Sequence, residues 1–158
     1  MRNTVFHRCA ISIAAVAILM ASAQNLSASP RDGVVRVKSA YSMSETISRL
    51  KKDIAKKGIK FFDEIDQSRL ASKEKIDLQP SVLLIFGNPA LGSHFITANP
   101  DAGLDWPVRL LVTQDKSGRV WAVYTDFDYI ARRHHIDNRK AQFNMASQVI
   151  SSITSSIK

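Results

Sequence analysis

Cysteine is nearly absent from this sequence: the 158 residues include only Cys9, which lies in an apolar N-terminal stretch. The remainder of the chain therefore has no disulfide and no thiol chemistry, and its stability must come from an apolar core. Internal repeats, coiled-coil heptads and low-complexity tracts are absent as well. With 45% hydrophobic and 23% charged residues, the composition is typical of one ordinary folded domain.

The N-terminus has the pattern of a secretory signal peptide. Arg2 and Arg8 precede an uncharged stretch, Cys9 to Ala23, which ends in small residues that suit a signal peptidase. We predict cleavage after Ala23. Cleavage after Ser29 is an alternative, and so is an uncleaved membrane anchor, although an anchor needs about 20 apolar residues.

Cleavage would leave residues 24–32 as a disordered linker and residues 33–158 as a single domain. Removing residues 1–23 lowers the net charge from +8 to +6. The basic residues alternate with acidic ones, which is typical of solvated faces rather than of a surface that binds nucleic acid. We therefore expect an exported bacterial protein, in the periplasm or outside the cell, with no nucleic-acid partner and no membrane attachment after cleavage.

The domain begins with the pattern of a strand and a helix. Val35 and Val37 alternate with basic residues, which predicts a strand with one solvated face. Ser42 and Glu45 have the spacing of a capping box, and Gly58 is placed to end the helix. The helix between them has an apolar stripe formed by Met43, Ile47, Leu50 and Ile54. The next stretch, IKFFDEID, predicts a strand whose inward face is ambiguous.

Three later strands and two helices complete the pattern. SVLLIFG, after Pro80, is an uninterrupted apolar run that suits a central strand. Turn residues 115–118 separate WPVRLLVTQ from RVWAVYT and predict a β-hairpin. The chain ends with a short helix, FDYIARRHHI, and a helix capped by Asp137 with an apolar stripe of Ala141, Met145, Val149 and Ile153. This order predicts an α+β fold: a mostly antiparallel sheet with helices packed on one face.

The stretch LLIFGNPALGSHFITANPDAGLDWPVRLLV, followed by GRVWAVYTDFDYIARRHHI, resembles domain of unknown function 302 (DUF302), a bacterial and archaeal family. The residues that carry the resemblance are Phe86, Gly87, Asn88, Pro89, Gly92, Pro100, Ala102, Gly103, Pro107, Trp121 and Tyr124. It implies a TATA-box-binding-protein-like β-α-β(4)-α topology and often a homodimer, and it implies no reaction. Where relatives usually have Asp-His after the second strand, this chain has Asp66 and Gln67.

The excursion between the apolar strands, residues 87–107, is the candidate site. Gly87 permits a turn, Asn88 can bond its own backbone, and Pro89 suits the first turn of a short helix. These residues favour a structural corner, yet a helix start also offers N–H groups to an anion. The ligand-site hypothesis comprises Gly87, Asn88, Pro89, Gly92, Ser93, His94, Trp106 and Tyr124. The two aromatic residues of this set also suit a core or an interface.

No pattern in the sequence defines a catalytic or metal centre. On a helix the adjacent His134 and His135 point about 100° apart, so they cannot share one metal ion, and we expect them at the surface or at a helix end. Ser93 and His94 are also adjacent and do not form a dyad. Three carboxylates would act as acid and base only if folding brought two of them together: Asp101, Asp105 and Asp126. We predict no metal and no cofactor.

The leading functional hypothesis is a module that binds a small ligand or an interaction partner beside residues 87–107. An enzyme with a polar cleft near the FGNP loop is one alternative, which a strongly perturbed acid or histidine would favour. A structural homodimer subunit is the second alternative. Burial of the region around Trp106 between two subunits would favour it.

Overall fold

The computed structural model describes residues 32–158, so the predicted signal peptide and residues 24–31 of the predicted linker lie outside the described residues. The strands are β1 (Val34–Lys38), β2 (Lys60–Asp66), β3 (Ser81–Gly87), β4 (Val108–Gln114) and β5 (Val120–Thr125). The helices are α1 (Met43–Lys56), α2 (Gln67–Lys73), α3 (Pro89–Ala98), the 3-10 helix η1 (Pro100–Leu104), α4 (Phe127–Arg133) and α5 (Lys140–Ser155).

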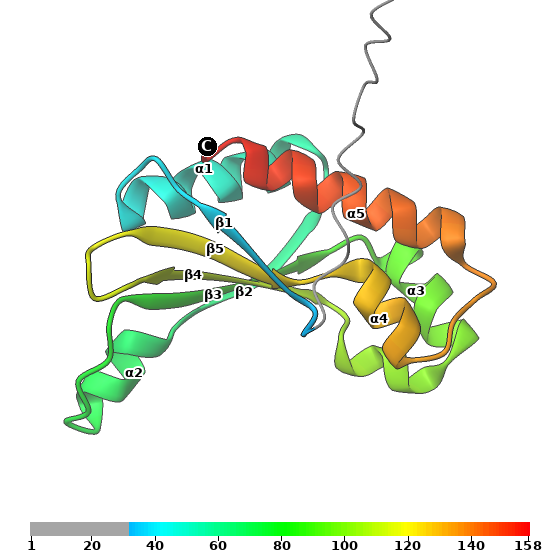
Figure 1. Ribbon diagram of the computed structural model, residues 1–158, viewed down its shortest axis with the longest axis horizontal. Coiled ribbons are helices and arrows are strands. Elements are labelled where there is room, and N and C mark those ends of the chain that lie inside the picture. Colours follow the sequence, from blue (N-terminus) through cyan, green and yellow to red (C-terminus); the bar gives the residue numbers. More distant parts are fainter. Residues whose placement is uncertain (1–31) are drawn as a thin grey trace, which may run out of the picture.

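The five strands form one sheet in the order β1-β5-β4-β3-β2, and every neighbouring pair is antiparallel. Helices α1 and α5 lie across one face of this sheet, whereas α2 lies at one end and α3 and α4 lie at the other (Figure 1). The predicted α+β class, the antiparallel sheet and the β4–β5 hairpin are confirmed. Helices α2, α3 and α4 each follow a strand directly, so they lengthen the molecule beyond the two ends of the sheet.

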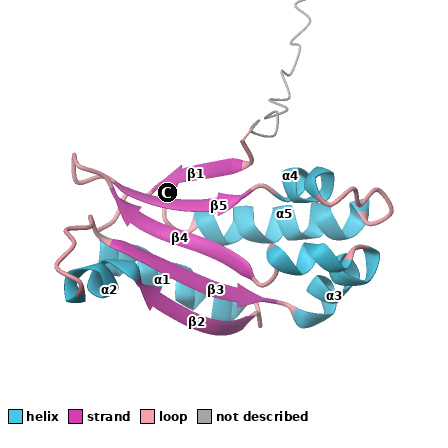
Figure 2. Cartoon of the chain, turned by 90° about the horizontal axis from the view of Figure 1, so that it is seen from below, coloured by secondary structure: helices cyan, strands magenta, loops and turns pink. Residues whose placement is uncertain are grey.

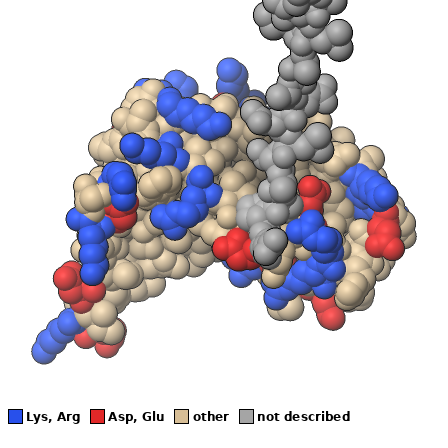
Figure 3. Space-filling model, in the orientation of Figure 1, with Lys and Arg blue, Asp and Glu red and all other residues tan. Residues whose placement is uncertain are grey.

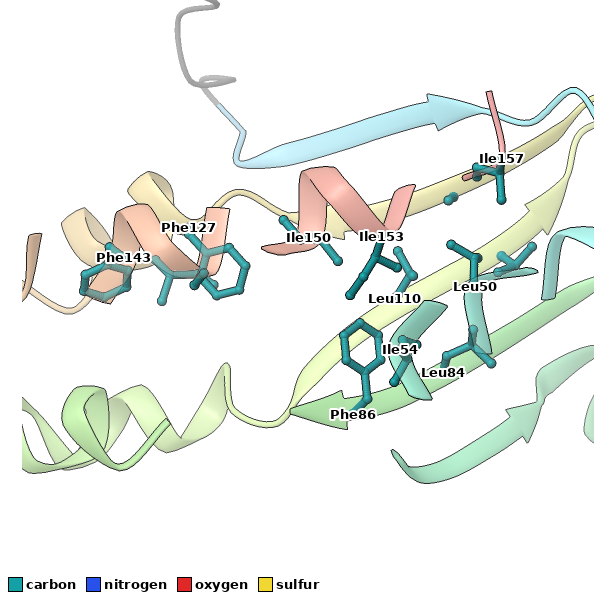
Figure 4. Close-up of a cluster of buried hydrophobic side chains, with 14 of the residues drawn as sticks. Leu50, Ile54, Leu84, Phe86, Leu110, Phe127, Phe143, Ile150, Ile153 and Ile157 are labelled. Carbon is teal, nitrogen blue, oxygen red and sulfur yellow. The ribbon is translucent and has the colours of Figure 1, made fainter. Parts of the chain in front are cut away.

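The core fills the layer between the sheet and its two long helices. Alternate residues of β3 and β4, among them Leu84, Phe86 and Leu110, are buried and face α1 and α5 (Figure 4). Leu50 of α1 and Ile153 of α5 are completely buried opposite them. Side chains alternate across a strand, so one face of each strand supplies this core.

Helix α1 has its predicted cap residue and apolar stripe, whereas the Glu45 carboxylate pairs with Arg49 instead of completing the predicted capping box. The Ser42 hydroxyl accepts a hydrogen bond from the Glu45 N–H, and Leu50 and Ile54 are buried on the expected stripe. Gly58 has φ of +64°, a left-handed conformation that a glycine adopts without steric cost. The ambiguity in the next strand is resolved by a bulge: the register skips Phe62, which is exposed, while Phe61 packs against the core.

Two predictions about α5 are wrong. The helix begins at Lys140, and Arg139 rather than Asp137 occupies its N-cap, without a side-chain hydrogen bond to the backbone. Met145, assigned to the apolar stripe, is 55% exposed. The same assignment fails at Ala141, which is exposed. A step of four residues drifts by about 40° around a helix, so a stripe at that spacing leaves the contact face.

The buried side of α5 instead alternates steps of three and four residues. Its members are Phe143, Ala146, Ile150, Ile153 and, just past the helix, Ile157. This spacing keeps the side chains on one side of the helix. Phe143 also stacks on Phe95 of α3, with ring centroids 4.3 Å apart, so α5 joins the sheet to the α3 end of the molecule.

The opposite face of the sheet is open: within residues 32–158, no helix covers it (Figure 2). A cross-strand row of half-buried aliphatic side chains crosses this face, formed by Ile65, Leu83, Leu111 and Val123. The outline of the molecule is hollowed along this side, between α2 and the end that carries α3 and α4 (Figure 3). Basic and acidic side chains are interspersed on the surface drawn there.

Candidate functional site

A cavity of about 180 Å³ opens where the sheet ends beneath α5. Its walls come from the α1–β2 junction, the end of β3, the start of α3, the segment before β4, the start of α4 and the middle of α5. Phe86 and Ile150, which line it, project from β3 and α5 into the layer between sheet and helix (Figure 4). Most lining side chains are hydrophobic; Lys57 and Asn88 are the polar ones.

The FGNP corner shapes one wall of this cavity. Gly87 ends β3, and the Asn88 Oδ1 accepts hydrogen bonds from the N–H groups of Ala90 at 2.9 Å and Leu91 at 3.3 Å. Pro89 occupies the first turn of α3, where its missing N–H is not needed. Asn88 therefore occupies the helix-start N–H groups that an anion would otherwise use, so α3 has a capped N-terminus rather than an anion site.

The Trp106 indole fills the space that two glycines leave open. A methyl group added at Gly87 or at Gly92 would overlap its ring atoms. Both glycines are buried, one at the end of β3 and the other inside α3. The space beside Gly92 is therefore occupied by the protein's own indole.

A buried carboxylate precedes this tryptophan. Asp105 is 8% exposed, and its carboxylate is hydrogen-bonded to His134 Nε2 at 2.6 Å, Arg133 Nη1 at 3.2 Å and Arg109 Nη2 at 3.2 Å. Charged partners compensate a carboxylate that burial removes from water. We call these four residues the Asp105 cluster. It joins the segment before β4 to the C-terminal end of α4.

The cluster corrects the prediction for His134. This residue does end α4, but its side chain is 5% exposed, so it is not a surface histidine. Its carbonyl oxygen also accepts a hydrogen bond from Asn99 Nδ2 at 2.9 Å. His134 thus contacts the residues at both ends of η1, Asn99 and Asp105. His135 is exposed, with φ of +52°.

Four of the eight predicted site residues lie at the cavity. Gly87, Asn88 and Trp106 line it, and Gly92 packs against the Trp106 indole. Pro89 shapes the corner but is not among the lining residues. Half of the predicted set therefore lies at this cavity, where the two glycines make room for the Trp106 indole.

The other three predicted residues lie elsewhere. Ser93 and His94 are exposed on α3, where the Ser93 hydroxyl donates to the Pro89 carbonyl at 2.8 Å. Tyr124 is half-buried on β5 and is not among the lining residues. Burial, followed by the charge of Asp126, raises the pKa of Tyr124, and a hydrogen bond with Thr154 acts in the opposite direction.

Sequence reasoning missed the contributions of distant elements. Lys57, Phe127, Ala146 and Val149 line the cavity and come from the end of α1, the start of α4 and the middle of α5. In the sequence, nothing distinguishes the three apolar residues from ordinary core positions. A correct apolar stripe for α5 would have included Ala146, but only the packing of α5 over the end of β3 makes it a cavity wall.

The acid–base candidates do not form a common site. Asp101 is exposed in η1, and Asp105 belongs to the Asp105 cluster. Asp126 caps α4, because its side chain accepts a hydrogen bond from the Tyr129 N–H at 2.8 Å. Among residues 32–158 there is no group of three histidine, cysteine or acidic residues that could hold a metal ion.

Fold and cavity together define a compact α+β domain with an apolar pocket between one end of the sheet and α5. Residues 35–156 match the family described as "Domain of unknown function DUF302", and the chain belongs to that family. The crystal structure of uncharacterized conserved protein DUF302 from Bacillus stearothermophilus has the same fold. It superposes with a TM-score of 0.73 at 17% identity, over 80% of this chain and 98% of that one.

Curated relatives share part of their length with this chain. "Fluoride-specific ion channel FluC 1" of Brucella suis biovar 1 (strain 1330) is 36% identical over 104 residues, which cover 66% of this chain and 41% of that protein. The same identity and length relate the chain to FluC 1 of Brucella abortus biovar 1 (strain 9-941), over 38% of that protein. The chain thus spans about two fifths of these relatives. In the part of the chain that the structure describes, no helix is both long and apolar enough to cross a membrane.

Proposed function

We propose that this protein is an exported module that binds a small apolar ligand in the cavity beside Trp106. The carrying observation is a cavity of about 180 Å³ whose walls are almost entirely hydrophobic. An engineered apolar cavity of about 150 Å³ takes up benzene, so this volume accommodates a ligand of similar size. An empty cavity also destabilises a core, since its walls lose packing partners.

Export is the second part of the proposal, and the N-terminal sequence supports it. Arg2 and Arg8 followed by an uncharged stretch to Ala23 are typical of a signal peptide. Expression of the full chain in a bacterium, with cell fractionation and mass measurement, tests it. We expect a periplasmic or secreted product that begins at Gln24, whereas an intact chain in the cytoplasm would contradict export.

Ligand binding is tested with a change that fills the cavity. The chain has two tryptophans, so a Trp121→Phe background isolates the fluorescence of Trp106. In that background, small apolar compounds should shift the Trp106 emission in a saturable manner. Val149→Phe should abolish the shift because Val149 lines the cavity, and Gln148→Phe, at the preceding, exposed position of α5, should not. Equal shifts in both variants, or no shift with the parent protein, would contradict the proposal.

The two alternative functions have less support. An enzyme was expected to have a polar cleft near the FGNP loop, yet the cavity there has only two polar lining residues, Lys57 and Asn88. A homodimer was expected to bury the region around Trp106, yet this indole already packs on Gly87 and Gly92 of its own chain. Sizing of the mature protein in solution tests the homodimer directly, and a dimer at micromolar concentration would restore that hypothesis.

Fluoride is a separate ligand to test, because the curated relatives carry the name of fluoride channels. A fluoride ion is strongly hydrated, and the two polar lining residues, Lys57 and Asn88, cannot replace its whole water shell in an otherwise apolar cavity. We expect fluoride to leave the Trp106 emission and the unfolding temperature unchanged at equal ionic strength. Saturable protection by fluoride that chloride does not reproduce would overturn this expectation.

A further inference from the structure

We infer that the cavity selects an apolar monocarboxylate: a carboxylate attached to a single ring or to a short branched chain. The inference rests on the proposed function and adds the chemical class of the ligand. Its basis is the chemical character of the two polar lining residues. Both side chains carry hydrogen-bond donors, and none of the lining residues is acidic.

The side chain of Asn88 has a fixed orientation. Its Oδ1 accepts from the backbone N–H groups of Ala90 and Leu91, which assigns the oxygen to the α3 side of the amide. The Nδ2 group then carries two hydrogens that are available to donate. At the cavity, Asn88 therefore suits a ligand that accepts hydrogen bonds.

Lys57 supplies the positive charge. Its Nζ lies 3.2 Å from Asp53 Oδ2 in an ion pair whose side chains are 28% and 20% exposed, respectively. An ammonium group has three hydrogens, so one carboxylate partner leaves others for a ligand. A lysine at the rim of an apolar cavity attracts an anion more strongly than it would in open water, because solvent screens the charge less there.

The apolar walls determine the remainder of the ligand. Phe86, Trp106 and Phe127 present three aromatic rings to the cavity. Aromatic side chains pack well against a ring in offset or edge-to-face geometry, and also against branched aliphatic groups. The volume of about 180 Å³ limits the apolar part to one ring or a short branched chain.

Two matched pairs of compounds test the class of ligand: benzoate with benzyl alcohol, and 3-methylbutanoate with 3-methylbutanol. Within each pair the apolar part is alike and the charge differs. Binding is measured at pH 7 through the Trp106 emission of the mature protein in the Trp121→Phe background. We expect each carboxylate to bind about tenfold more tightly than its alcohol, the factor that one hydrogen bond between charged groups supplies.

Substitutions assign that difference to the proposed donor. Lys57→Gln removes the charge and should weaken carboxylate binding about tenfold while alcohol binding stays unchanged. Lys56→Gln is the matched control, because Lys56 is the preceding, exposed residue and does not line the cavity. Asp53→Asn removes the competing carboxylate, so it should strengthen carboxylate binding.

The outcomes separate the two proposals. Alcohols that bind as tightly as carboxylates, with no effect of Lys57→Gln, would overturn the carboxylate assignment and leave the apolar cavity as the ligand site. Absence of binding for all four compounds, in the parent protein and in Val149→Phe alike, would overturn both. Carboxylate binding that survives Val149→Phe would place the anion outside the cavity and would also overturn the inference.

Discussion

The two ends of the β4–β5 pair use the same three residue types in different ways. At the turn, Asp115 accepts hydrogen bonds from Arg119 Nε at 2.9 Å and from Trp121 Nε1 at 3.0 Å. At the opposite end, Asp105 is bound by arginines and immediately precedes Trp106. The Asp105 side chain is 4% exposed and the Asp115 side chain is 26% exposed. Each end thus combines aspartate, arginine and tryptophan, but only the aspartate at the Asp105 end is buried.

The difference shows what each carboxylate organises. The hydrogen-bond partners of Asp115 lie within six residues of it, so it shapes a local turn. Asp105 contacts Arg133 and His134, which lie 28 and 29 residues away along the chain. A local network forms with the hairpin itself, whereas a distant one forms only when α4 packs on the segment before β4. Asp105 therefore stabilises the tertiary structure beside the cavity.

The largest expected effect is at the buried end. Asp105→Ala should lower the free energy of unfolding by about 3 kcal/mol, because His134 is left buried without its carboxylate while the two arginines regain water. It should also weaken ligand binding, since the change releases the segment that holds Trp106. Denaturant unfolding measures the first effect. Asp101→Ala, at an exposed position in η1, is the control, and equal losses in the two variants would show that the buried contacts of Asp105 do not cause the effect.

The second-largest loss of stability is expected at Gly92, which packs against the Trp106 indole. Gly92→Ala should destabilise the fold by about 2 kcal/mol, because the added methyl overlaps the Trp106 ring and overpacks a filled site. Gly103→Ala is the matched control, since nothing lies within 4 Å of the position of its Cβ. Unfolding curves and Trp106 emission in the Trp121→Phe background report the result. Unchanged stability and emission in Gly92→Ala would show that the indole does not depend on this contact.

A smaller effect is expected at the turn. The hydrogen bonds from Ser117, Trp121 and Arg119 lower the pKa of Asp115. A lowered pKa stabilises the fold above the unfolded value of 3.8 and loses that contribution as the pH falls below it. Asp115→Asn should therefore be less stable than the parent at pH 7, by less than Asp105→Ala, and the difference should shrink in acid. A difference that is constant from pH 7 to pH 2 would contradict this cause.

The smallest effect at neutral pH is expected between the two ends, at Tyr124. Burial and the nearby charge of Asp126 raise the pKa of Tyr124 above the usual tyrosine value of 10.0. The fold is therefore stabilised below pH 10, where the tyrosine is neutral in both states, and loses stability as the pH rises through the folded pKa. Tyr124→Phe should lose less stability than the parent between pH 9 and pH 11. Parallel pH profiles for the two proteins would contradict the assignment.

Local features of this fold were predictable from the sequence. Ser42 as a helix cap, Gly58 as a helix end and the turn at Asp115 follow from interactions within a few residues, and the structure has all three. The antiparallel sheet and its helix-covered face follow from the order of elements. The apolar stripe of α5 was misplaced because several short stretches of that helix are apolar, and the packing of α5 on the sheet decides which side is buried.

The candidate site was predictable only in part. The FGNP corner drew attention through its unusual residues, and three of them lie at or beside the cavity. The pairing of Asp105 with His134 joins residues 29 positions apart, and no local spacing indicates it. Lys57 reads as one of several lysines at the end of a helix. Its place at the cavity rim depends on how α1 and β3 meet.

The seating of one large side chain on two residues that lack side chains imposes a reciprocal size constraint on positions 87, 92 and 106. Homologues that keep the indole should keep both glycines, whereas a lineage that exchanged the indole for a smaller residue would be free to introduce side chains at 87 and 92. Covariation of these three positions would then follow the width of the cavity beside residue 106 across DUF302 proteins. Under the proposed function, a change of ligand among these proteins should be accompanied by changes at these three positions.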